Sequence, residues 1–136
     1  MANNDRFKFR IWYASRMYYL DHYERREGKW WWWLREKDDD MWDTWVTEGK
    51  DDFVVMQSTG LRDTVTQLIF EGDILKSMDG YLTFYGAVVW HEAGGFWAID
   101  WQHGPSGVIL SEYSGSARII GNIHRNPELV RAGPTA

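Results

Sequence analysis

The chain has 136 residues, of which 44% are hydrophobic and 26% are charged. This size and balance are typical of one soluble globular domain, or of two very small units that share a core. The formal net charge of −5 disfavours general binding to polyanions unless the basic residues cluster. The absence of cysteine from the sequence excludes disulfide bonds and thiolate metal sites.

No segment of the sequence has the pattern of a signal peptide, a membrane span or a lipid anchor. The first residues have no apolar stretch, and charges begin at Asp5 and Arg6. The longest uncharged apolar run is far shorter than the roughly 18 residues that a spanning helix needs. We therefore expect a soluble cytoplasmic protein with no membrane partner.

Charge and tryptophan are unevenly distributed along the chain. Residues 1–35 carry a net charge of +4, residues 36–52 carry −6 and residues 53–136 carry −3. Seven of the ten Trp residues lie between Trp12 and Trp45. We predict an aromatic N-terminal β part, residues 1–52, packed on a β-rich C-terminal part, residues 53–136.

The N-terminal part shows the alternation that is typical of half-buried strands. Apolar and polar residues alternate over 7–13, which predicts a half-buried strand. Two aromatic runs, 30–34 and 41–46, are joined by the charged residues 35–40, and this predicts a β-hairpin with a solvated tip.

The C-terminal part contains short apolar runs separated by turn residues. Strands at this spacing, with Gly at the corners, predict a small antiparallel barrel and a mainly β (α+β) fold. A helix-start pattern at residues 126–128 predicts a short terminal helical turn. The predicted strands cover residues 53–57, 72–78, 81–91, 96–101, 107–113 and 118–123.

The catalytic and metal-binding motifs in the sequence are incomplete. His91-Glu92 lacks the second His of a zinc-binding helix, because Gly95 stands in its place. The acidic run 38–40 lacks the ligand spacing of a calcium loop. No Ser lies in a nucleophile elbow. We expect no enzyme activity, no cofactor and no metal site; a metal-assisted enzyme whose carboxylates the fold brings together is the third alternative.

The four consecutive Trp residues allow two interpretations. On a strand, alternate Trp side chains face opposite sides, and a small sheet buries only one side well. The second set, with Trp42 or Trp45, is then covered by the rest of the chain or by another subunit. A base-stacking platform is the less favoured alternative, because the adjacent acidic segment repels phosphate. We predict a symmetric homo-oligomer with an interface drawn from Trp30, Trp31, Trp32, Trp33 and Trp42, containing either the Trp31–Trp33 pair or the Trp30–Trp32 pair.

Five blocks of sequence occur in the order typical of one protein family: Phe9–Trp12, Met17–Tyr19, Val55–Asp63, Ile69–Leu75 and Ile120–Leu129. Through them the chain resembles the YopX-like family of small phage and prophage proteins. The resemblance implies a mainly β fold with an SH3-like C-terminal barrel, frequent oligomerisation and a bacterial host. It implies no activity, because the family has no established biochemical function.

Four residues in these blocks are expected at structural turns. Gly60 and Gly72 are expected where the backbone needs a positive φ or a close approach. Glu71 and Asp73 are expected to hydrogen-bond the amides of turns. This structural interpretation is favoured over a catalytic one, because strongly perturbed carboxylates are rare.

The sequence therefore favours a non-enzymatic phage or prophage accessory protein. It would act in the cytoplasm of the bacterial host as an oligomeric binding or interaction module, with either a phage or a host protein as a further partner. The alternative is a nucleic-acid-binding protein that uses the SH3-like barrel. Its ligand surface would be Trp90, Trp97 and Trp101, and its phosphate contacts would come from Lys8, Arg10, Arg25 and Arg26.

Overall fold

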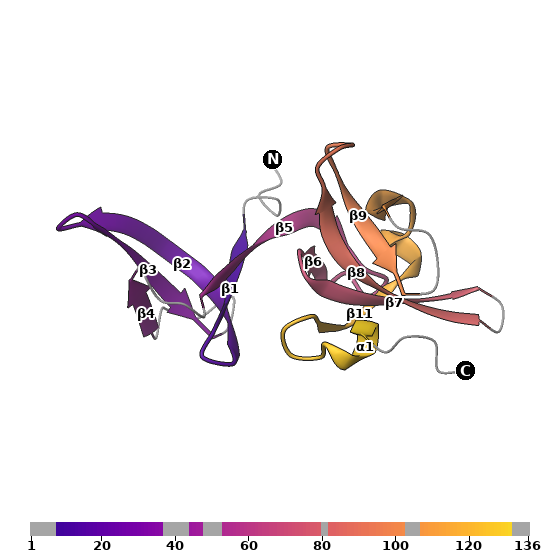
Figure 1. The fold of residues 1–136 in the computed structure, drawn as a ribbon, viewed down its shortest axis with the longest axis horizontal. Helices are drawn as coiled ribbons and strands as arrows, with labels where there is room; N and C mark the ends of the chain where they lie inside the picture. Colours follow the sequence, from indigo (N-terminus) through magenta and orange to yellow (C-terminus); the bar gives the residue numbers. More distant parts are fainter. Residues whose placement is uncertain (1–7, 37–43, 48–52, 80–81, 103–106, 132–136) are drawn as a thin grey trace. The chain divides into compact units, whose positions relative to one another are not determined.

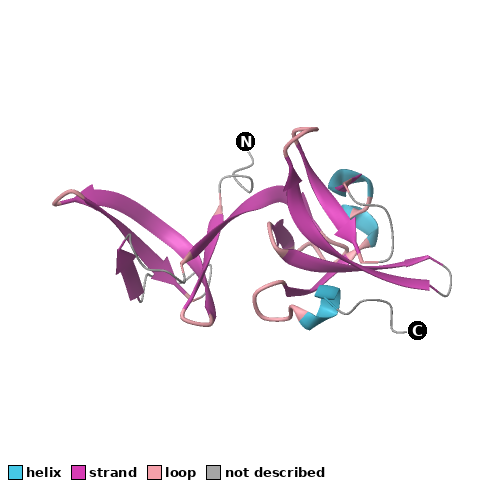
Figure 2. Cartoon of the chain, viewed as in Figure 1, coloured by secondary structure: helices cyan, strands magenta, loops and turns pink. Residues whose placement is uncertain are grey.

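A computed structural model describes residues 8–36, 44–47, 53–79, 82–102 and 107–131. In this part of the chain the secondary structure is almost entirely β-strand, with short helical turns near the C-terminal end (Figure 2). The chain divides between Gln57 and Ser58 into two compact units. The prediction of a mainly β fold is confirmed.

The N-terminal unit is an antiparallel sheet whose strands follow the order β4-β3-β2-β1-β5. Two-residue turns join β1 to β2 and β2 to β3. In the second of these turns Glu27 has φ 51° and Gly28 has φ 78°. Two successive positive φ angles match the right-handed twist of a hairpin. The strands are β1 (Phe9–Tyr13), β2 (Arg16–Arg26), β3 (Lys29–Arg35), β4 (Thr44–Thr47) and the first half of β5 (Val54–Arg62), shown in Figure 1.

One side of this sheet carries the small core of the unit. The core consists of buried apolar side chains from four strands, Ile11, Tyr18, Leu34 and Val46. Because alternate residues of a strand share a face, Trp30 and Trp32 lie on the same side as Leu34, whereas Trp31 and Trp33 lie on the opposite side. Most of the predicted charged tip between β3 and β4 lies outside the described residues.

The C-terminal unit contains a second antiparallel sheet, with strand order β10-β9-β8-β7-β11. The second half of β5 pairs with β6 in the same unit. The prediction of a strand over 107–113 is wrong beyond Ile109, where the 3-10 turn Leu110–Glu112 replaces it. The apolar alternation stops there, because Ser111 and Glu112 are both exposed. The elements are β6 (Leu68–Phe70), β7 (Asp73–Asp79), β8 (Leu82–His91), β9 (Phe96–Trp101), β10 (Val108–Ile109), the 3-10 turns Leu110–Glu112 and Ser114–Ser116, β11 (Arg118–Asn122) and α1 (Glu128–Arg131).

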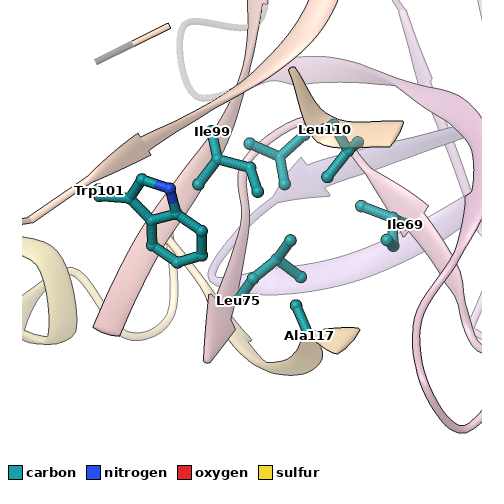
Figure 3. Close-up of a cluster of buried hydrophobic side chains, with 7 residues drawn as sticks. Ile69, Leu75, Ile99, Trp101, Leu110 and Ala117 are labelled. Atoms are coloured by element: carbon teal, nitrogen blue, oxygen red, sulfur yellow. The ribbon is translucent and has the colours of Figure 1, made fainter. Parts of the chain in front are cut away.

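A cluster of buried apolar side chains fills the C-terminal unit (Figure 3). Two members of the cluster, Val88 on β8 and Ile99 on β9, lie directly opposite each other in the sheet. The cluster contains Ile69, Leu75, Val88, Ile99, Trp101, Leu110 and Ala117. Within the described residues, no helix is long and apolar enough to cross a membrane.

Candidate functional site

The N-terminal sheet carries exposed aromatic side chains on both of its faces. On one face, Trp33 lies opposite Trp45 across β3 and β4. The ring of Trp31 lies 5.1 Å from that of Trp45 and 6.3 Å from that of Trp33. Trp45 is 53% exposed although it belongs to this cluster. We refer to the side of the sheet with Trp31, Trp33 and Trp45 as the Trp45 face.

The opposite side of the same sheet is hollowed into an open apolar groove. The groove has a volume of about 420 Å³. Tyr23 pairs with Trp32 across β2 and β3, so it shares the face of Trp32 and lies on the opposite side from Trp45. Its ring centroid is 5.6 Å from that of Trp30 and 5.0 Å from that of Trp32. We call this feature the Tyr23 groove; it is lined by Phe9, Leu20, Tyr23, Trp30, Trp32 and Val55.

A second cleft adjoins the Tyr23 groove. It has a volume of about 430 Å³ and shares Phe9, Leu20 and Tyr23 with the groove. The pairing of β2 with β3 shifts register between Leu20 and His22, and this bulge lies at the cleft. The other lining residues are polar or charged, and they are Lys8, Asp21, His22 and Arg35. We call this second cleft the charged cleft.

Asp21 is held at the charged cleft by two neighbours. The imidazole Nδ1 of His22 donates a hydrogen bond to Asp21 Oδ2, and Arg35 Nη1 donates one to Asp21 Oδ1 at 2.9 Å. The hydrogen bond from His22 is the largest cause that lowers the pKa of Asp21. Desolvation by burial opposes it, and the hydrogen bond from Arg35 lowers the pKa further. Asp21 is therefore ionised at neutral pH.

His22 is also fixed by an aromatic contact. Its ring stacks on Trp33 with 4.6 Å between centroids and 7° between the ring planes. The guanidinium carbon of Arg26 lies 5.2 Å from the centroid of the same indole. These contacts join the charged cleft to the Trp45 face through the side chain of His22.

Replacing Asp21 with Asn is expected to lower the free energy of unfolding by less than about 1 kcal/mol at neutral pH, because partly exposed ion pairs contribute little. The pKa of Asp21 is lower in the folded state, so its stabilisation is complete above the unfolded-state pKa and is lost as the pH falls through the folded-state pKa. The difference between variant and wild type should therefore shrink as the pH is lowered below about 4. Urea unfolding across this range measures the difference, and a gap that widens in acid would contradict it.

The remaining aromatic residues proposed from the sequence are distributed differently. Trp42 lies outside the described residues. Trp101 is 9% exposed and packs in the C-terminal core against Tyr113. Trp90 is 45% exposed, and its ring lies 5.1 Å from that of Trp97, measured between centroids, in a T-shaped arrangement. The fold therefore does not bring Trp90, Trp97 and Trp101 to one exposed surface.

Of the residues expected at turns, Glu71 and Gly72 lie in the turn between β6 and β7, whereas Gly60 lies within β5, where the pairing with β6 shifts register. Gly60 has φ 79° and Gly72 has φ 87°, a region that L side chains rarely adopt. The carboxylate of Asp73 is 1% exposed, and its Oδ2 accepts a hydrogen bond of 2.8 Å from the N–H of Phe70. Glu71 is half-buried in the turn between β6 and β7.

A buried carboxylate that sequence reasoning did not single out is Asp63, which is 5% exposed. Its Oδ1 accepts hydrogen bonds from the N–H groups of Val65 and Gln67, at 3.0 and 2.9 Å. Its Oδ2 accepts one of 2.9 Å from Ile119. An Asp before a polar loop is the signal of an Asx turn, and this pattern could have pointed to it. In the described part of the chain, no group of three or more His, Asp or Glu residues could hold a metal ion.

Two antiparallel sheets in a chain of this length define a small, mainly β protein. The model of the YopX protein family matches residues 8–131, and the chain belongs to this family. The resemblance identified from the sequence blocks is thereby confirmed.

Two solved structures share the fold. Protein yopX from Bacillus subtilis is 19% identical, with a TM-score of 0.58, and the match covers 93% of this chain and 99% of that one. Protein EF1440 from Enterococcus faecalis is 24% identical, with a TM-score of 0.55, and the match covers 91% of this chain and 97% of that one. No curated protein sequence matches this chain.

Proposed function

We propose that this YopX family member is a phage or prophage accessory protein that works in the bacterial cytoplasm as a self-associating interaction module. The contact between copies would be centred on the Trp45 face. The observation that carries the proposal is the 53% exposure of Trp45 on a strand at the edge of the sheet. Within one chain Trp33 is 9% exposed and Trp31 is half-buried, so Trp45 is the ring of this cluster most open to a partner.

The exposed area of the Trp45 indole is large enough to contribute substantially to the free energy of association. Half of a Trp side chain is on the order of 100 Å². At roughly 25 cal/mol per Å², covering it contributes about 2–3 kcal/mol for each copy. Large aromatic residues at the centre of an interface commonly carry most of its binding energy. A stable interface needs about 800 Å² per partner, so Trp45 would be the anchor of a larger contact.

Replacing Trp45 with Ser is expected to weaken self-association by about 30-fold, which corresponds to about 2 kcal/mol. Sedimentation equilibrium measures the mass against the 16.1 kDa of a monomer. Tyr23 provides a matched control, because it is also 53% exposed but lies on the opposite face. Tyr23→Ser should leave the mass unchanged. A wild-type protein that is monomeric at micromolar concentration, or an unchanged oligomer after Trp45→Ser, would reject the proposal.

A further inference from the structure

We propose that the Tyr23 groove and the charged cleft together form a binding site for single-stranded nucleic acid. The aromatic end of this site is on the opposite face from Trp45, whereas His22 at the charged end stacks on Trp33 of the Trp45 face. The proposal does not depend on the self-association proposed above. The two hollows share Phe9, Leu20 and Tyr23, so they form one continuous groove. One end of it is aromatic and the other end is charged. Single-stranded nucleic acid has bases with flat apolar faces and negatively charged phosphates, so it can contact both an aromatic and a charged surface.

The aromatic end offers rings against which bases can stack. Tyr23 is 53% exposed and lies within 5.6 Å of Trp30 and 5.0 Å of Trp32, measured between ring centroids. Its side chain is the most accessible ring of the three, so a base would meet it first. The rings are held by the paired strands β2 and β3, so little side-chain freedom is lost on binding.

The charged end contains cationic side chains, which attract the negative charge of phosphate. Lys8 and Arg35 line it, and among the described residues that line it Asp21 is the one ionised acid. The charge of Asp21 is partly offset, because Arg35 and His22 both donate to it. A further cation stands at the aromatic end, where the guanidinium carbon of Arg25 is 5.8 Å from the centroid of Trp30. Among the described residues that line the two hollows, Lys8, Arg35 and Asp21 have formal charges that sum to +1, whereas the whole chain carries −5.

The shape of the groove favours a strand over a duplex or a free nucleotide. In a duplex the bases are stacked on one another, so their faces cannot reach Tyr23. The two adjoining hollows, of about 420 and 430 Å³, are each in the size range of a small ligand. Because every base has an aromatic face that can stack, we expect little preference among bases.

The test is a titration of the full chain into a fluorescently labelled oligo-dT of about 12 nucleotides, followed by anisotropy. Tyr23→Ser is expected to weaken binding about tenfold, and Tyr23→Phe should restore it because the ring face returns. Trp45→Ser is the matched control, since it removes an equally exposed aromatic side chain from the other face. It should leave binding unchanged even if it dissociates an oligomer.

Salt dependence tests the phosphate contacts independently of the aromatic ring. Each contact contributes about −0.7 to the slope of log affinity against log salt for a single strand. Arg25→Ala should reduce the slope by that amount, whereas the exposed Arg118 on β11 provides a control that should not. The proposal is overturned if oligo-dT does not bind at low salt, if Tyr23→Ser binds as wild type, or if a duplex or an acidic peptide competes as well as the strand.

Discussion

Replacing Asp63 with Ala is expected to lower the free energy of unfolding by about 3–4 kcal/mol, because the buried carboxylate accepts three backbone hydrogen bonds. The N–H groups of Val65 and Gln67 lie in an exposed loop and can regain water, but that of Ile119 is in a paired strand. Most of the lost stability should therefore come from the hydrogen bond to Ile119, which also connects the loop to β11. Urea unfolding monitored by circular dichroism measures the change.

Two further variants make this prediction specific. Asp63→Asn keeps one carbonyl oxygen but turns an N–H₂ group toward a backbone donor, so its stability should lie between those of wild type and Asp63→Ala. Asp100 is an exposed carboxylate that accepts a single backbone bond, from Gly107 at 3.0 Å. Asp100→Ala should cost less than about 1 kcal/mol. Equal losses for Asp63→Ala and Asp100→Ala would contradict the role assigned to Asp63.

Gly86→Ala is expected to destabilise the protein by about 2 kcal/mol, because no space exists for one added methyl group. A Cβ at Gly86 would lie 2.5 Å from Cγ2 of Ile99 and 2.8 Å from Cε3 of Trp101. Ile99 is fully buried and branched at Cβ, so it cannot rotate away. The clash must move the core of the C-terminal unit. Thermal and urea unfolding both report the loss.

Gly115→Ala is the matched control for this substitution. A Cβ there would meet nothing within 4 Å, and Gly115 is exposed. Its change in stability should be within about 0.5 kcal/mol of zero. If Gly86→Ala also leaves the stability unchanged, Ile99 and Trp101 do not pack closely against the backbone of β8 at Gly86.

Sequence periodicity located most strands in both units but neither β2 nor the short β6. The first half of β2 was visible only as part of a family block, and its second half, from Asp21 to Arg26, is mostly charged and exposed. The bulge between Leu20 and His22 also shifts the apolar pattern to the other face. Because pairing with β1 and β3 stabilises this strand, no local pattern in its own residues could identify it.

The candidate sites were predictable only in part. Strand alternation correctly separates Trp31 and Trp33 from Trp30 and Trp32. It cannot say which side of a sheet is covered, and so Trp101, which was assigned to a ligand surface, is found in the core. The Tyr23 groove depends on residues from four strands whose register was unknown. Phe9 and Tyr23 are brought to one groove by pairing, not by spacing in the sequence.

The contact of Asp63 with Ile119 has a consequence during protein synthesis. The two residues are 56 positions apart, and the hydrogen bond joins them directly. A ribosome that adds roughly 5–20 residues per second needs roughly 3–11 s to make that length of chain. During this interval the strands up to Gln57 can already pair with one another, whereas the loop after Asp63 still lacks its anchor on β11. The N-terminal sheet, with its exposed Trp45, is therefore the first part of the nascent chain able to meet a partner.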